Sequence, residues 1–278
     1  MTAKRTLGIF ALVSVLPMLF SCSSAPSGPK MGTPAFYWQA AKEVYAAGDY
    51  NKTLQHLDNL LATDNEYNDR ALPWALVLKS GLAAGYIEGA DNYAVGARLN
   101  RSDPSLFRRQ VSEYRDSASR MALTFAEDYG RLSRVKGDTI ALVFAYPKGT
   151  ASPVPQFTKI TSGIPLPAAE TDAAQARVLE RGVLLAACRA AGAPDDTAKT
   201  EGLLRTGTAS VPRATFLMAM AEALYNDSQI YVADKLDQPQ KLVIFCERAA
   251  DALKGVPESK ATKALDAKIQ AALKKANK

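Results

Sequence analysis

The chain has 278 residues and a formal net charge of +6, with 47% hydrophobic, 22% charged and 8% aromatic residues. This length and composition allow one or two globular domains, and they exclude wholesale disorder and collagen-like repetition. Because 48 residues are alanine, the strongest helix former, we expect an α-rich fold. The single histidine, His56, excludes most histidine-based metal sites and His-relay hydrolases.

The first residues have the form of an export signal. Lys4 and Arg5 precede an uncharged apolar run, residues 6–19, which is too short to span a bilayer and contains Pro17. The run ends in Leu19-Phe20-Ser21-Cys22, which resembles the lipobox of bacterial lipoproteins. The resemblance implies that residues 1–21 are a signal peptide and that Cys22 becomes the lipid-modified N-terminus. Phe20 departs from the small or β-branched residue usual there, and an ordinary secretory signal is the alternative.

Residues 22–33 are rich in serine, proline and glycine, a composition typical of a flexible tether. Ser23 follows the cysteine. By resemblance to the sorting pattern of diderm bacteria, the absence of aspartate there favours the outer membrane. We therefore expect a lipid on Cys22, a tether, and a single α-helical domain over residues 34–278 on the periplasmic face of the outer membrane.

Residues 34–63 are predicted to form a helical hairpin. Thr33-Pro34 suits the start of its first helix, and Gly48-Asp49-Tyr50 its turn. The segment AKEVYAAGDYNKTLQHLDNLLATD resembles a tetratricopeptide repeat, with small Ala41, aromatic Tyr45, the GDY turn and the Leu57–Leu60 side of the second helix. Thr53 and Asn65 stand where the family usually has alanine and often has proline. The resemblance implies a stack of three or more hairpins.

Two further helices are expected next. One runs from Ala71 to about Gly85 and is predicted to end or bend in the glycine-rich stretch 81–96. The other covers 104–134, with Asp103 as its cap and Pro104 in its first turn. An apolar stripe at steps of three or four predicts its buried face: Phe107, Val111, Tyr114, Ala118, Met121, Phe125, Tyr129 and Leu132.

Residues 138–167 interrupt the helical pattern. Asp138 to Tyr146 is predicted to be a strand, and the prolines after it indicate an irregular excursion with a small hairpin at Phe157 to Thr161. Helices are expected again over 168–191, 197–205 and 211–226. Asp195-Asp196 directly precede the 197–205 helix, and two acids there suit its positive end rather than a metal.

The last part carries a second, weaker resemblance to a tetratricopeptide repeat over residues 225–257, with a turn at Leu236 to Pro239. Residues 258–275 then have the form of a capping helix, with apolar residues every four positions. The predicted fold is all-α, made of stacked, degenerate tetratricopeptide-like hairpins with a short β and proline-rich excursion at about 138–167. Seven lysines and two acids over 254–278 indicate a solvated face, with attraction to anionic lipid as the alternative.

Most catalytic and cofactor signatures are absent from the sequence, so we expect no enzyme, cofactor, metal site or nucleic-acid partner. Cys188 and Cys246 each lie in an apolar helical run. Two buried thiols are the simpler interpretation, and a disulfide is the alternative in an oxidising compartment.

Eight arginines gather within residues 98–134, and this cluster is the main candidate site: Arg98, Arg101, Arg108, Arg109, Arg115, Arg120, Arg131 and Arg134. Arg108 and Arg115 are seven residues apart, so both lie on one side of the predicted helix. Arginine forks bind carboxylate or phosphate. Ordinary pairing with acids of the same helix, Glu113, Asp116, Glu127 and Asp128, is the alternative.

These features together predict a lipid-anchored interaction or scaffold protein of the cell envelope, which binds a protein or peptide partner without catalysis. Tyr37 and Trp38 are candidate contact residues in a groove between hairpins, as are Arg108 and Arg115. The alternative is a binding subunit that passes a small anionic solute to a transporter. An open groove would favour the first function, and a small enclosed cavity lined by arginine would favour the second.

Overall fold

The computed structural model describes residues 28–276 and is predominantly helical, which confirms the all-α class. The predicted signal peptide, the lipobox and Cys22 lie outside the described residues. In chain order the α-helices and strands are α1 (Pro34–Ala47), α2 (Tyr50–Leu61), α3 (Asn68–Leu99), α4 (Ser105–Tyr129), β1 (Thr139–Leu142), α5 (Gln156–Thr161), α6 (Ala168–Ala190), α7 (Thr197–Leu204), β2 (Ala209–Pro212), α8 (Arg213–Ser228), α9 (Pro239–Leu253) and α10 (Lys260–Ala276). Short 3-10 turns cover Leu132–Arg134 and Gln229–Tyr231. No helix in the described part of the chain is long and apolar enough to cross a membrane.

Helices α1 and α2 form the hairpin expected at residues 34–63. The side chain of Thr33 accepts a hydrogen bond from the backbone N–H of Phe36 (3.3 Å) and so caps α1. Gly48 ends that helix at φ 90°, a left-handed conformation that glycine adopts without steric cost. Asp49 then caps α2 by accepting from the N–H of Lys52 (3.0 Å). Local signals therefore define this hairpin.

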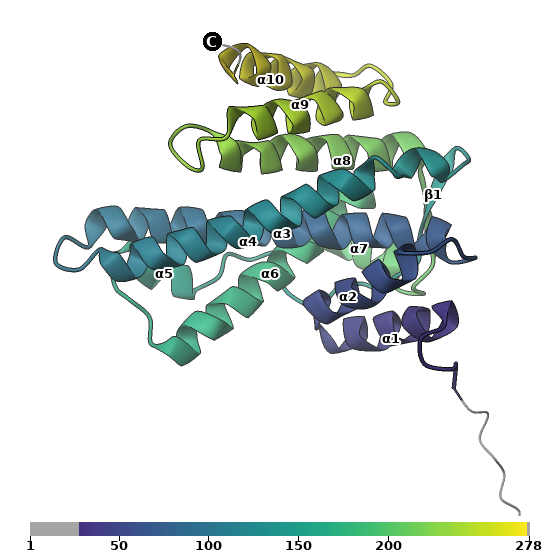
Figure 1. Cartoon of the computed structure of the whole chain (residues 1–278), viewed down its shortest axis with the longest axis horizontal. Helices are drawn as coiled ribbons and strands as arrows, with labels where there is room; N and C mark the ends of the chain where they lie inside the picture. The colour runs from purple at the N-terminus through teal and green to yellow at the C-terminus, as the bar shows by residue number, and fades with distance from the viewer. Residues whose placement is uncertain (1–27, 277–278) are drawn as a thin grey trace, which may run out of the picture.

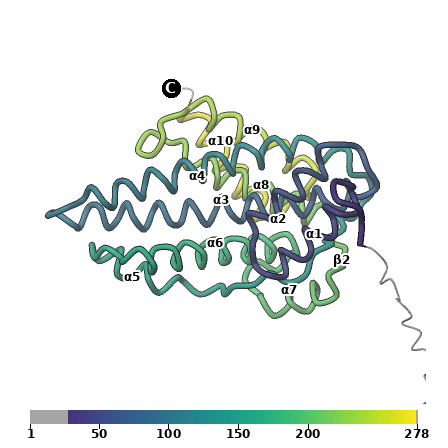
Figure 2. Tube along the Cα trace, turned by 60° about the horizontal axis from the view of Figure 1, so that its bottom comes forward, coloured from purple at the N-terminus to yellow at the C-terminus, as the bar shows by residue number. Residues whose placement is uncertain are grey.

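Helix α3 does not end in the glycine-rich stretch, and this part of the sequence prediction is wrong. It runs unbroken from Asn68 to Leu99 through the middle of the molecule, between α4 and α6 (Figures 1 and 2). Its glycines are points of close helix approach. A Cβ added to Gly182 of α6 would lie 2.1 Å from the carbonyl oxygen of Gly81, and one added to Gly89 would lie 2.1 Å from the ring of Tyr114 on α4. Packing against two neighbours therefore outweighs the weak helix propensity of glycine.

Helix α4 ends at Tyr129, earlier than predicted, and the chain continues into the 3-10 turn. Asp103 accepts a hydrogen bond from the backbone N–H of Ser105 (3.1 Å), which satisfies one of the free N–H groups of the first turn. The predicted apolar stripe faces the core: Phe107, Tyr114, Ala118, Phe125 and Leu132 are buried, and Val111, Met121 and Tyr129 are half-buried.

The predicted strand exists, but its partner differs from the expectation. β1 pairs antiparallel with β2, and Ile140 lies opposite Val211. The segment Phe157 to Thr161, expected as the second strand of a hairpin, belongs to helix α5. Residues Val211 and Pro212, expected in a helix, belong to β2, and α8 begins at Arg213. The pairing joins segments about 70 residues apart, so no turn signal in the sequence marks it.

The C-terminal helices α8, α9 and α10 form successive layers on one side of α3 and α4 (Figure 1). Residues 232–238 link the 3-10 turn after α8 to α9, and backbone hydrogen bonds within this segment close it into a compact loop. One hydrophobic core extends from Trp38 of α1 to Ile269 of α10. The described helices thus share one core.

Candidate functional site

An open groove of about 400 Å³ lies where α3 and α4 meet the 232–238 loop, and we refer to it as the cationic groove. Arg108 and Arg115 of α4 both line it, one two-turn step apart on the same helix face. Lys235 lines it from the loop. The remaining lining residues are small or apolar: Ala94, Ala97, Val111, Ser112 and Leu236. Alanine at positions 94 and 97 of α3 leaves the room that larger side chains would fill.

Arg115 holds the loop against α4. Its Nη1 donates a hydrogen bond to the backbone carbonyl of Lys235 (3.1 Å). Its Nε is buried and has no hydrogen-bond partner among the described residues. On the same side, the hydroxyls of Tyr231 and Ser119 are 3.2 Å apart and joined by a hydrogen bond. Arg115 thus uses one donor for structure and retains others for a ligand, since a guanidinium has five N–H groups.

The charges of the groove are unequally neutralised. Lys235 forms an ion pair with Asp91 of α3, with Nζ 2.7 Å from the carboxylate. In the described part of the chain, neither Arg108 nor Arg115 forms an ion pair with an acid. Arg108 is exposed, and Arg115 is half-buried. Two guanidinium charges therefore face an open groove without an internal counter-charge, an arrangement that attracts carboxylate or phosphate.

Three other members of the arginine cluster have partners on or next to α4, and two of these partners are acids. Arg109 lies 3.4 Å from Glu113 one turn along α4, and Arg131 lies 3.1 Å from Asp128. Arg120 donates to the hydroxyl of Ser117 (3.0 Å). The structure therefore divides the cluster, and the two arginines singled out by their spacing are brought together in one groove.

Tyr37 and Trp38 lie far from the cationic groove. In both overall views α1 is at the opposite end of the molecule from the loop after α8 (Figures 1 and 2). Trp38 is only 8% exposed, because it stacks on Tyr67 and meets Trp74 edge-on, with ring centroids 5.4 and 5.6 Å apart. Tyr37 is half-buried beside the ring of His56, at a centroid distance of 6.2 Å. These contacts are those of packing, so the two aromatics do not belong to the same site as the arginines.

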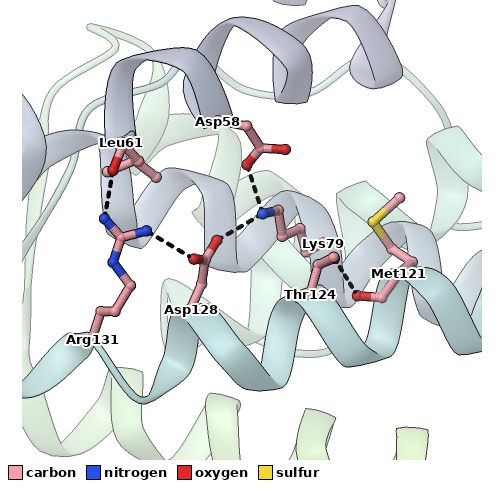
Figure 3. Close-up of polar contacts among 7 residues, drawn as sticks. All are labelled: Asp58, Leu61, Lys79, Met121, Thr124, Asp128 and Arg131. Atoms are coloured by element: carbon pink, nitrogen blue, oxygen red, sulfur yellow. Dashed lines mark hydrogen bonds and ion pairs between the residues drawn. The ribbon is translucent and has the colours of Figure 1, made fainter. Parts of the chain in front are cut away.

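A second polar cluster, centred on the buried Lys79, lies between α2, α3 and α4 (Figure 3). Lys79 of α3 lies 2.7 Å from Asp58 of α2 and 2.7 Å from Asp128 of α4. Arg131 donates to Asp128 and, at 2.6 Å, to the carbonyl of Leu61. Burial lowers the pKa of Lys79, but the hydrogen bonds and charges of the two carboxylates outweigh it and raise the pKa overall.

This cluster has a structural role, because every charge in it already has a partner. Its members belong to three elements far apart in sequence, so it fastens the α1–α2 hairpin to the long helices. The sequence carried one signal for it that was not used: Lys79 is the lone charge in the apolar run PWALVLKSGLAAG. A charge inside such a run needs a partner in the folded protein.

In the described residues, the two thiols and the acids at the start of α7 form no catalytic or metal centre. Cys188 and Cys246 are both buried, free thiols, so the described structure has no disulfide between them. Burial raises the pKa of both thiols. Asp196 caps α7 by accepting from the N–H of Lys199 (2.8 Å), as expected for a helix start. Among residues 28–276 no group of three or more histidines, cysteines or acids is placed to hold a metal.

Comparison with other proteins does not supply a relative. No protein-family model matches the chain, and neither the curated proteins nor the solved structures contain a match.

Proposed function

We propose that this chain is a lipid-anchored, non-catalytic interaction protein of the bacterial cell envelope, which binds an acidic segment of a partner protein in the cationic groove. The observation that carries the proposal is the pair Arg108 and Arg115, which line one groove without an acid partner in the described residues. An acidic segment supplies the carboxylates that both guanidinium groups bind in a bidentate manner.

The openness of the groove favours a peptide segment over a small solute. A solute-binding site normally encloses most of its ligand, whereas Arg108 is exposed and the groove opens at the surface between a helix pair and a loop. An extended segment can lie along such a groove and continue beyond it. A subunit that carries a small anion to a transporter is therefore the less favoured function.

The anchor and the repeat architecture belong to the same proposal. The lipobox-like Leu19-Phe20-Ser21-Cys22 supports lipid attachment at Cys22, and acyl chains anchor by burying methylenes in the bilayer. The α1–α2 hairpin, with helices of 14 and 12 residues, supports a degenerate tetratricopeptide-like origin for the stack. If lipid attachment is correct, Cys22→Ala moves the protein from the membrane fraction to the soluble envelope fraction. A variant that stays in the membrane fraction contradicts it.

Selection of displayed peptides on the immobilised protein tests the binding function. We expect enrichment of sequences rich in aspartate and glutamate, and binding that weakens steeply as salt is raised. Arg108→Gln together with Arg115→Gln should weaken a selected peptide by at least about tenfold, because hydrogen bonds to charged groups contribute roughly 1.5–3 kcal/mol.

The matched control removes the same charge from the same helix outside the groove. Arg109→Gln together with Arg120→Gln changes two exposed arginines that do not line it. This control should leave peptide affinity within about twofold, since only long-range attraction is lost. Equal losses in both double variants, or enrichment of peptides without acids, would contradict binding in the cationic groove.

A further inference from the structure

A second cavity, of about 460 Å³, lies on the other side of the 232–238 loop, and we refer to it as the α10 pocket. It is bounded by the end of α8, the 3-10 turn and loop after it, the start of α9 and the C-terminal half of α10. Figure 1 shows α10 as the outermost layer, resting on α9. The volume falls within the range of small-molecule sites, and the cationic groove shares none of its lining residues.

The pocket lies where small side chains line one side of α10. On its inward side, Leu265 and Ile269 are buried and Leu273 packs half-buried against the core. The last two turns present Ala271, Ala272 and Ala276 to the cavity, and a methyl group is too short to fill the space that a leucine would occupy. The end of α10 therefore stands over an apolar hollow that the described residues leave unfilled.

The walls of the α10 pocket are mainly apolar. Val232 and Leu242 line it together with the alanines, and Tyr231 adds an aromatic ring. The hydroxyl of Tyr231 is already bonded to Ser119 of α4, so it adds no free polar group to the site. A ligand that fills these walls must have an apolar body.

The charged residues of the pocket favour an anion. Lys268 and Lys275, seven residues apart on α10, both line it. Neither lysine forms an ion pair with an acid of residues 28–276. Asp237 is the acid that lines the pocket. Burial raises the pKa of Glu222 on α8, and the charges of Arg189 and Lys268 only partly oppose that rise. The two lysines thus retain charge for a ligand whose polar end is a carboxylate.

We propose that the α10 pocket binds a carboxylate-headed amphiphile of the fatty-acid class, with its chain against the alanine side of α10 and its carboxylate between Lys268 and Lys275. The charge complementarity and the apolar walls define both ends of the ligand. This site is distinct from the cationic groove, because the two share no lining residue.

Titration of the full chain with dodecanoic acid, kept below its critical micelle concentration, tests the proposal by displacement of dansylaminoundecanoic acid fluorescence. Affinity should rise about fourfold for each methylene added from octanoic acid upward until the pocket is full. The methyl ester of dodecanoic acid should bind at least about tenfold more weakly than the acid, because it carries no charge for the lysines.

Two pairs of variants separate this pocket from nonspecific binding. Ala272→Phe fills the cavity and should abolish displacement, whereas Ala267→Phe, on the exposed side of α10, should not. The double variant Lys268→Gln, Lys275→Gln should reduce the affinity for dodecanoic acid to that for its methyl ester. The control variant Lys260→Gln, Lys263→Gln removes equal charge from the same helix and should change the affinity for the acid by less than about twofold.

Far-UV circular dichroism establishes that each variant is folded before titration, and ester binding by the Lys268→Gln, Lys275→Gln variant shows that its pocket is intact. Equal affinity for acid and ester, unchanged displacement with Ala272→Phe, or equal losses in the two lysine variants would overturn the proposal. Arg108→Gln alone, which keeps the Arg115 hydrogen bond to the loop, should bind dodecanoic acid normally, so failure of either function is distinguishable from failure of the other.

Discussion

Substitution of the buried Lys79 by methionine should destabilise the protein by about 3 kcal/mol. The Lys79 side chain is only 5% exposed, and its two partners differ: Asp58 is 52% exposed and Asp128 is 12% exposed. The exposed pair contributes roughly 0–1 kcal/mol. Removing one partner from a buried pair costs roughly 3–5 kcal/mol, because it leaves a buried charge uncompensated. Arg131 stays on Asp128 at 3.1 Å, which places the expected loss at the low end of that range.

Urea unfolding at pH 7, followed by far-UV circular dichroism and by the fluorescence of the two buried tryptophans Trp38 and Trp74, measures this loss. For a domain of this size, about 3 kcal/mol corresponds to a fall in Tm of roughly 6–12 °C. The folded-state pKa of Lys79 is raised. Its stabilising contribution is therefore fully present below the unfolded pKa of about 10.4, and it is lost as the pH rises through the folded pKa.

A surface pair supplies the control for Lys79→Met. Lys263 and Glu258 lie 3.0 Å apart, but their side chains are 66% and 77% exposed, so Lys263→Met should cost less than about 1 kcal/mol. Adding Asp128→Leu to Lys79→Met should deepen the loss, because Arg131 then also loses its carboxylate partner. If Lys79→Met costs no more than Lys263→Met, the buried cluster does not fasten the hairpin to the long helices.

Three further outcomes follow from the structure. Gly182→Ala should lower stability by about 1–3 kcal/mol, because its Cβ would meet the carbonyl oxygen of Gly81 at 2.1 Å. The control Gly202→Ala, in open space on α7, should instead add roughly 0.5–1 kcal/mol in the same urea assay. Equal effects of the two substitutions would contradict the close approach of α3 and α6. Burial raises the pKa of Asp227, and its Oδ2 has no partner in the described residues. The contribution of Asp227 to folding stability is therefore fully present below its unfolded pKa of about 3.9. It is lost as the pH rises through the folded pKa. Asp227→Asn should therefore be more stable than the unmodified chain at pH 7 by about 1–3 kcal/mol, with the gain shrinking toward pH 4, and a gain independent of pH would contradict this reasoning. Finally, alkylation in denaturant without reductant should label both Cys188 and Cys246 in a mass spectrum, whereas unlabelled peptides joined by a disulfide would show that the thiols pair.

Sequence signals were most informative where the structure depends on neighbouring residues. Thr33, Gly48 and Asp49 cap or end helices at the expected positions because each acts on backbone groups within a few residues. The apolar stripe of α4 likewise identified its buried face, since helical periodicity alone determines which side chains share that face.

Errors arose where the structure depends on distant segments. The glycines of α3 resemble a helix end until α6 and α4 are seen packed against them, so continuity of the helix is a tertiary effect. The pairing of β1 with β2 joins segments with no local turn between them, and Phe157 to Thr161 has β-type composition yet forms a short helix. Propensity is a weak guide for such short elements.

The sequence predicted only part of the candidate site. A spacing of seven on one helix was enough to group Arg108 with Arg115. Lys235 was missed, because it reaches the same groove from a loop 120 residues further along the chain, and no spacing rule connects a loop residue to a helix. The α10 pocket was missed for a similar reason: alanines in a capping helix look like ordinary packing until the facing loop is in place.

In-cell photo-cross-linking from the cationic groove tests the central claim most directly. A photoreactive residue at Ser112, which lines the groove between Arg108 and Arg115, should give one dominant adduct with an envelope protein, cross-linked through an acidic segment. The adduct should disappear with Arg108→Gln plus Arg115→Gln and persist with Arg109→Gln plus Arg120→Gln. An adduct that survives loss of both groove arginines, or one formed through a segment without acidic residues, would contradict acidic partner binding in the groove.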